Sequence, residues 1–257
     1  QAAAGAFSVT GEEDGTPLVP GPTTGDSGTG VQLGMAILAA YVQRTRTGEG
    51  QEIEISMQEA MTYYMRSRIG IGSKWGTQAA QRRGRSGGLP PVDLYPCKPF
   101  GPNDWAYFMP VTSGHWDALC LATDRPDLLV DPRFITNKDR ATNGEELYEE
   151  IAKWTRSLTK QEAMEKAGDA GVPAAAVLDT KELHNDPHLL ERGFVKTVDH
   201  PIHGEVPLLG FAPRMSASDV PIKAAPLLGE HTSEVLIEEL GLEPEEINSL
   251  RAAGVLR

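Results

Sequence analysis

Residues 24–30 read Thr-Gly-Asp-Ser-Gly-Thr-Gly, and an apolar segment from Val31 to Val42 follows them directly. Glycine lets a ligand come close to the main chain, and the three glycines here surround one carboxylate, Asp26. The apolar segment has almost no polar face, which predicts a helix buried on most sides. Unpaired N–H groups at the start of such a helix would keep Asp26 ionised and partly desolvated, as a candidate nucleophile. The alternative, which this stretch alone favours, is that Asp26 or Ser27 caps the helix.

Length and composition describe an ordinary globular protein. The 257 residues allow one or two domains, and hydrophobic and charged residues make up 40% and 23% of the chain. A net charge of −12 argues against a nucleic-acid partner, because phosphates need a basic face. Much of the acidity lies in a run that we interpret as solvated helix surface, formed by Glu230, Glu234, Glu238, Glu239, Glu243, Glu245 and Glu246.

Cysteine usage and hydropathy favour a cytoplasmic protein. Cys97 and Cys120 match no metal-ligand spacing and allow at most one disulfide, which is typical of a reducing compartment. The longest apolar run, Leu33 to Val42, is too short to span a bilayer. No signal-peptide pattern precedes it. We therefore expect a cytoplasmic chain that contacts no membrane.

Residues 1–69 are expected to form two helices joined by one strand, as the remainder of a large domain. The first helix ends at a glycine in the turn at 47–50. Residues 51–56 alternate polar and apolar side chains, which predicts a half-buried strand. A helical period then begins at Met57. Asp26 and Met57 therefore lie at the starts of the two helices, and we expect them to face one cavity.

Residues 70–91 break the periodic pattern and are interpreted as a linker with a glycine loop. Arg82, Arg83 and Arg85 could bind an anionic ligand, or they could belong to a solvated loop. The pair Gly87-Gly88 fits either a flexible lid over a cavity or an ordinary loop. Nothing in the local sequence decides between these alternatives.

A small α+β domain is predicted over residues 92–180, and residues 181–257 are expected to return to the large domain. In the small domain, the patterns predict strands at 92–97 and 105–109, helices at 113–122, 143–157 and 160–170, and a short strand at 172–177. In the C-terminal segment, they predict a helical turn at 179–185, strands at 194–199 and 205–209 around His203-Gly204, and helices ending near Leu240 and starting near Pro244. Thr159 and Glu162 have the spacing of a capping box at the start of a helix.

The histidines offer only weak candidates for chemistry. His200 and His203 are close enough to suggest a metal site, but a turn between two strands is the better interpretation. His231 is expected to hydrogen-bond to backbone at the start of the last helices. The sequence has no phosphate-binding loop, zinc-protease helix or serine-hydrolase elbow. The residues alone therefore indicate a two-domain α/β protein with one candidate aspartate.

Eight short segments, which follow one another along nearly the whole chain, form a recognisable pattern. The first four are Gly25–Gly30, Ile37–Ala40, Arg46–Gln51 and Ser56–Ala60. The others are Asp131-Pro132-Arg133-Phe134, Ala170–Pro173, Asp186–Leu189 and Pro226–Thr232. Together they resemble the family III CoA-transferases, and most closely their formyl-CoA:oxalate branch. The resemblance implies an α/β chain that is the C-terminal part of a Rossmann-like fold with a smaller α+β domain.

The resemblance also implies an activity, and it reverses the preference for capping by Asp26. In this family the aspartate matching Asp26 is the covalent nucleophile, and the methionine matching Met57 lines the acyl and thiol pocket. A glycine-rich loop that shields the intermediate falls near Gly87-Gly88, where this chain has fewer glycines. The implied reaction moves CoA from an acyl-CoA to a small carboxylic acid through aspartyl anhydride and aspartyl-CoA thioester intermediates, with no cofactor or metal. The alternatives are an acyl-CoA racemase or epimerase of the same fold, and a non-catalytic subunit that completes a split transferase.

Members of this family carry a substantial Rossmann-like portion before the position of Gln1, which supplies most of the CoA-binding surface. They form interlocked homodimers. We therefore expect residues 1–257 to need an N-terminal portion or a partner chain. The apolar segment from Val31 to Val42 supports this expectation, because such a helix needs covering layers on more than one side.

Overall fold

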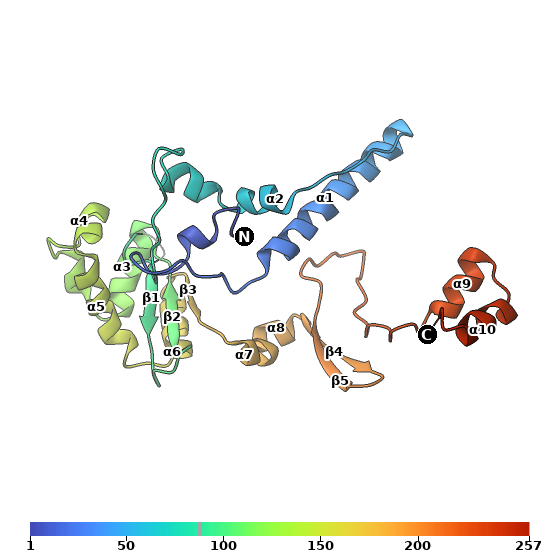
Figure 1. The fold of residues 1–257 in the computed structure, drawn as a ribbon. Coiled ribbons are helices and arrows are strands. Elements are labelled where there is room, and N and C mark those ends of the chain that lie inside the picture. The colour runs from blue at the N-terminus through green and yellow to red at the C-terminus, as the bar shows by residue number, and fades with distance from the viewer. Residues whose placement is uncertain (87–88, 257) are drawn as a thin grey trace. The chain divides into compact units, whose positions relative to one another are not determined.

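The computed structural model describes residues 1–86 and 89–256, and the chain divides into two units, residues 1–177 and residues 178–257 (Figure 1). The first unit contains the candidate nucleophile and a small core of strands and helices. The boundaries expected at 69 and 91 both lie inside this unit. The structure does not divide the chain at either boundary, and these two domain boundaries stay predictions.

The first unit begins with a long helix and a short one. Helix α1 covers Thr24–Thr47 and helix α2 covers Met57–Tyr64. The expected glycine stop of α1 is confirmed, because Gly48 has a left-handed φ of 80° and its N–H donates to the carbonyl of Arg44. Helix α2 starts at Ser56, whose hydroxyl accepts a hydrogen bond from the N–H of Glu59. A π-helical turn, Arg68–Gly72, follows α2.

The strand expected at 51–56 is wrong. These residues are not part of a sheet, although Ile53 and Ile55 are half-buried and the polar residues between them are exposed. The segment returns along α1, and Gln51 donates from Nε2 to the Gln43 side chain at 2.7 Å. The alternating pattern therefore describes an extended chain with one sheltered side. A strand also needs a neighbour to pair with, and the described residues provide none for this segment.

The prediction that α1 is buried on most sides is also wrong for this chain. Only Thr29 of α1 is buried. Helix α2 packs against the N-terminal part of α1, and the rest of the helix extends away from it (Figure 1). The exposed apolar residues of α1, which we call the open face, are Val31, Met35, Ile37, Leu38, Tyr41 and Val42. The open face is a large apolar surface on a single helix.

The core of the first unit is a three-stranded antiparallel sheet covered by helices. The strands are β1 (Asp93–Pro96), β2 (Trp105–Phe108) and β3 (Ala174–Ala176), in the order β1-β2-β3. The helices are α3 (Ser113–Ala122), α4 (Asn137–Thr142), α5 (Gly144–Thr155) and α6 (Lys160–Asp169). All three strands and the helices α3, α5 and α6 confirm the expectations, whereas the short helix α4 was not expected.

Aromatic side chains fill this core. Tyr95 of β1 stacks on Tyr148 of α5 with ring centroids 5.1 Å apart, and it lies 5.3 Å from Phe108 of β2. Alternate residues of β2 are buried, because Ala106 and Phe108 share the covered face of the strand. The predicted capping box of α6 is confirmed, since Thr159 and Glu162 each accept a hydrogen bond from the other's N–H.

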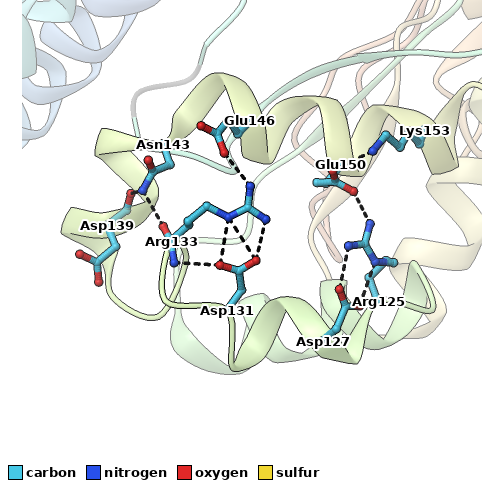
Figure 2. A network of polar contacts seen from close by, with 9 residues as sticks. All are labelled: Arg125, Asp127, Asp131, Arg133, Asp139, Asn143, Glu146, Glu150 and Lys153. Carbon is cyan, nitrogen blue, oxygen red and sulfur yellow. Dashed lines mark hydrogen bonds and ion pairs between the residues drawn. The ribbon is translucent and has the colours of Figure 1, made fainter.

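The segment Asp131-Pro132-Arg133-Phe134 has a structural role (Figure 2). The Asp131 carboxylate pairs with the Arg133 guanidinium at 2.7 Å and accepts the N–H of Arg133 at 2.9 Å. Arg133 also reaches Glu146 of α5 at 2.6 Å. These contacts fix the turn that places Phe134, which is fully buried, in the core.

The second unit contains two short helices, a hairpin and two final helices. Its elements are α7 (Thr180–Asn185), α8 (Pro187–Glu191), β4 (Val195–His200), β5 (Gly204–Leu209), α9 (Thr232–Leu240) and α10 (Pro244–Ala252). The hairpin confirms the expected strands, and its turn has Gly204 at φ 66°. Of the described residues in this unit only Ile247 is buried, so the unit has almost no core of its own.

The two histidine expectations in this unit have different outcomes. His200 and His203 lie at the hairpin turn as expected, and His200 Nδ1 accepts the N–H groups of Ile202 and His203 at 3.2 and 3.3 Å. The expected hydrogen bond from His231 to backbone is wrong. His231 precedes α9 without a side-chain cap. In the turn before it, the carboxylate of Glu230 accepts the N–H of Leu227 at 2.6 Å.

Candidate functional site

Asp26 lies inside the first turn of α1. The helix begins at Thr24 after Thr23, so the third helical position is Asp26 and neither Asp26 nor Ser27 occupies the cap position. The capping interpretation is therefore wrong. The unpaired N–H groups of this turn create a local positive field that favours an anion. The side chain of Asp26 is exposed rather than partly desolvated, and among the described residues it forms no ion pair.

The glycines of this turn have different surroundings. A Cβ atom on Gly28 would lie 2.8 Å from Cε2 of Tyr64 and 3.1 Å from its hydroxyl oxygen, so the Tyr64 ring lies directly on Gly28. A Cβ atom on Gly30 would have no neighbour within 4 Å among the described residues. Gly28 is therefore required by helix packing, and Gly30 leaves open space. The sequence alone did not indicate Tyr64, although it lies seven residues after Met57, on the same face of α2.

Asp26 and the α2 contact lie on different faces of α1. Gly28 contacts Tyr64, and Gln32 donates from Nε2 to the carbonyl of Ala60 at 3.2 Å, which places Gly28 and Gln32 on the face toward α2. Asp26 lies on a different side of the helix. On that side it is in line with Gly30, four residues later, and with Ile37, eleven residues later. Ile37 belongs to the open face. The candidate nucleophile thus lies at one edge of the open face, next to Ile37, whereas Met35 and Val42 of the open face lie nearer to the α2 side.

Met57 does not lie beside Asp26 in this structure. The contacts of residue 28 with residue 64 and of residue 32 with residue 60 show that α1 and α2 run antiparallel. Because each step back along α2 matches a step forward along α1, Met57 lies level with residue 35. That position is roughly 13 Å from Asp26 along the axis of α1. Met57 is exposed, as is Asp26. The two side chains do not share a described cavity.

Gln1 borders the Asp26 turn on another side. Its Nε2 donates to the carbonyl of Pro22 at 3.2 Å and to the hydroxyl of Thr24 at 3.4 Å. A Cβ atom on Gly25 would lie 3.5 Å from Cγ of Gln1. The Oε1 atom of Gln1 is buried, and no hydrogen-bond donor reaches it from the described part of the chain. The start of the chain therefore packs against the turn that carries the candidate nucleophile.

Two of the three arginines before the glycine pair, Arg82 and Arg85, bind to the protein itself. The Arg82 guanidinium donates to the backbone carbonyls of four residues, Ser8, Glu12, Glu13 and Gly15, at 2.6–3.3 Å. Arg85 pairs with Glu145 at 3.0 Å and lies over the ring of Tyr148 at 4.0 Å. The anion-binding interpretation is therefore not supported for Arg82 and Arg85. Gly87 and Gly88 lie outside the described residues, so a shielding role for them stays a prediction.

The two cysteines are poor candidates for chemistry. Burial raises the pKa of the Cys97 thiol to about 11 and that of Cys120 to about 12. Such thiols are poor nucleophiles at neutral pH. No group of three His, Cys, Asp or Glu side chains in the described chain is arranged to hold a metal ion. None of the described helices has both the length and the apolar character needed to cross a membrane.

Comparison with known proteins decides the family. The family model described as CoA-transferase family III matches residues 1–232. The chain belongs to this family. It is 36% identical over 269 residues to a formyl-CoA:oxalate CoA-transferase of Streptomyces coelicolor, covering 100% of this chain and 65% of that protein. The formyl-CoA:oxalate CoA-transferase of Escherichia coli O157:H7 is also 36% identical, with 98% of this chain and 64% of the relative covered. The chain thus spans about two thirds of the length of these relatives.

Solved structures of the CoA-transferase family III fold confirm the expected fold class. A CAIB/BAIF family protein from Brucella suis superposes with a TM-score of 0.75 at 24% identity, covering 93% of this chain and 61% of that protein. The protein Rv3272 from Mycobacterium tuberculosis gives a TM-score of 0.72 at 20% identity, covering 90% of this chain and 61% of the neighbour. The fold of this family III chain is consistent with the C-terminal part of these proteins.

Proposed function

We propose that this family III chain carries the nucleophile of a CoA-transferase that moves CoA from an acyl-CoA donor to a small carboxylic acid. The observation that carries the proposal is the position of Asp26, exposed in the first turn of α1 and without an ion-pair partner among the described residues. The relatives named formyl-CoA:oxalate CoA-transferases support the reaction class.

The proposed reaction begins with attack of an Asp26 carboxylate oxygen on the thioester carbonyl of the donor. The C–S bond breaks, which gives a mixed anhydride on Asp26 and free CoA thiolate. The thiolate then attacks the aspartyl carbonyl, which forms an aspartyl-CoA thioester and releases the donor acid as a carboxylate. The acceptor carboxylate attacks this thioester, which forms a second mixed anhydride on Asp26 and releases CoA thiolate again. The thiolate then attacks the acceptor carbonyl of this anhydride, which gives the acceptor acyl-CoA and frees the Asp26 carboxylate. Covalent capture splits one difficult exchange into easier steps.

The first turn of α1 suits this role. Asp26 must be an anion before it attacks the donor and again after the product leaves. The positive field at the N-terminus of a helix stabilises a carboxylate in the first turn. Gly30, one turn further along the same face, leaves open space within 4 Å of where a Cβ would lie. An acyl group could thus approach the carboxylate over the backbone of α1.

The complete site is proposed to need protein beyond these 257 residues. Asp26 lies at one edge of the open face of α1, and Met57 lies level with a more distant part of α1. We propose that an N-terminal portion or a partner chain covers this side, closes the acyl pocket with Met57, and supplies most of the CoA surface. The interlocked dimer and the shielding role of Gly87-Gly88 belong to the same proposal. Relatives longer than this chain support it.

Trapping the intermediate tests the mechanism. The complete assembly is incubated with acyl-CoA and hydroxylamine, digested, and analysed by mass spectrometry. The expected result is a hydroxamate on Asp26, with transfer lost in Asp26→Asn and retained in Asp14→Asn, a matched change at another exposed aspartate. Turnover with Asp26 unmodified would exclude this mechanism. Exchange of the α-proton of a 2-methylacyl-CoA without an acceptor acid would instead indicate a racemase, and unchanged transfer in Asp26→Asn would indicate a non-catalytic subunit.

A further inference from the structure

The second unit contains a groove of about 480 Å³ that the proposed transfer reaction does not use. It lies between the end of α8, the start of β4 and the loop that follows β5, so it is built from residues 189–220 alone. Its volume is within the range of small-molecule sites. Three cationic side chains line it: Arg192, Lys196 and Arg214.

In the described part of the chain, none of these three cations has a partner. Among the described residues, the side chains of Arg192, Lys196 and Arg214 form no ion pair and no hydrogen bond. One carboxylate, Asp219, also lines the groove. Three positive charges against one negative charge leave an excess of positive charge. In a chain with a net charge of −12 this is a local reversal of sign. Such a surface attracts anions.

The groove also has an aromatic and apolar wall. Phe194, Phe211 and Met215 line it together with the cations. The loop that carries Phe211 is anchored to the start of β4, because the N–H of Gly210 donates to the carbonyl of Phe194 at 2.6 Å. A Cβ atom on Gly210 would lie 3.0 Å from that carbonyl oxygen, so the close approach depends on glycine. The two phenyl rings are therefore held on segments that are bonded to each other.

We propose that this groove binds a phosphorylated nucleoside. Arginine and lysine side chains bind phosphate oxygens through charge-assisted hydrogen bonds, and aromatic rings provide flat surfaces on which a base can stack. A simple inorganic anion would use the cations but not the rings, and an apolar ligand would use the rings but not the cations. The ligand has one of two sources, the nucleotide end of CoA or a free nucleotide. The inference does not depend on Asp26, because neither source needs the transfer reaction in order to bind.

Calorimetric titration of the full chain, in its complete assembly, tests this proposal. The probes are adenosine 3′,5′-bisphosphate, which is part of CoA, and ADP. The expected result is saturable binding that weakens roughly tenfold in Arg192→Gln and in Arg214→Gln, since each removes a charged contact to phosphate. Lys223→Gln is the matched control, because Lys223 is exposed in the same loop region but does not line the groove. Binding in the control should equal that of the unchanged chain.

The outcomes separate the sources and the competing explanations. Tighter binding of the bisphosphate than of ADP would support the CoA end, and the reverse would support a free nucleotide. Phe211→Leu should weaken both probes without changing the affinity for inorganic phosphate. Absence of binding at millimolar probe, equal loss in Lys223→Gln, or phosphate binding as tight as nucleotide binding would overturn the proposal. Binding of an acidic peptide with neither probe bound would overturn it as well. Asp26→Asn should bind the probes normally, so failure of the transfer mechanism and failure of this site are distinguishable.

Discussion

Gly28 and Gly30 lie two residues apart in α1 but have opposite surroundings. Alanine is a better helix former than glycine, so Gly30→Ala is expected to raise the free energy of unfolding by about 0.5–1 kcal/mol. At Gly28 the added Cβ meets the Tyr64 ring at 2.8 Å, and the ring must move. Gly28→Ala is therefore expected to be about 1–2 kcal/mol less stable than Gly30→Ala. Urea unfolding of both variants, followed by circular dichroism, measures the difference.

The control for these two variants repeats both alanine substitutions in a chain that lacks the Tyr64 ring. In a Tyr64→Ala background the two alanine variants should have nearly equal stability, because the clash is gone. Equal stability of Gly28→Ala and Gly30→Ala in the unchanged background would contradict the packing of Tyr64 on Gly28.

The two thiols provide a second test at the scale of single residues. Cys97 and Cys120 are fully buried, and their raised pKa values of about 11 and about 12 leave at most about one thiol in a thousand ionised at pH 8. Native protein is expected to resist iodoacetamide at that pH, and both thiols should react after unfolding in urea. Mass spectrometry counts the alkylated sites. Rapid alkylation of either cysteine without unfolding would show that the core around β1 and α3 opens locally.

At the scale of elements, the ion pairs around α5 link stability to pH (Figure 2). Hydrogen bonds from Arg133 lower the pKa of the Asp131 carboxyl from its ordinary value of 3.8, and those from Arg125 lower that of Asp127. A carboxyl whose pKa is lower in the folded chain stabilises the fold above its ordinary pKa. This stabilisation is lost as the pH falls through the folded value.

The expected result is a fall in the urea midpoint as the pH decreases from about 5 to about 3. The fall should be smaller in Arg133→Gln, which removes the partner of Asp131. Arg251→Gln is the matched control, because Arg251 donates to the hydroxyl of Ser233 and pairs with no described carboxylate. Identical pH profiles for the unchanged chain and Arg133→Gln would show that the pair adds nothing to stability.

At the scale of the whole molecule, the open face of α1 predicts the behaviour of the chain alone. Exposed apolar surface of this kind promotes association. Expressed without an N-terminal portion, residues 1–257 are expected to aggregate or to bind a hydrophobic dye. Co-expression with that portion should give a compact complex with low dye binding. Light scattering and dye fluorescence measure both states.

A variant separates the open face from other causes of association. Replacement of Met35 and Leu38 by glutamine should lower dye binding of the isolated chain, because both residues are more than half exposed. The same double change at two exposed apolar residues of the second unit, Val235 and Leu240, is the control. A soluble, cooperatively unfolding and CoA-transferring protein made from these 257 residues alone would contradict the expectation.

Local signals in the sequence determined most of the helices and the hairpin. The limits of α3 agree with the expected 113–122, and the capping box at Thr159 and the turn at His203-Gly204 lie where they were expected. Caps, turns and periodicity act over a few neighbouring residues, so a short window of sequence contains the whole interaction. The residues around Asp26, together with the other segments in register with them, were likewise sufficient to indicate the family.

Only the tertiary structure decided which surfaces are covered. The same apolar residues of α1 are compatible with a buried helix and with an open face, and the alternating residues 51–56 are compatible with a strand and with an unpaired extended segment. The contact of Tyr64 with Gly28 joins residues 36 positions apart, and the pairing of Arg133 with Glu146 joins two separate elements. Burial and pairing depend on what another part of the chain, or another chain, places against a segment, and that partner is not encoded within the segment itself.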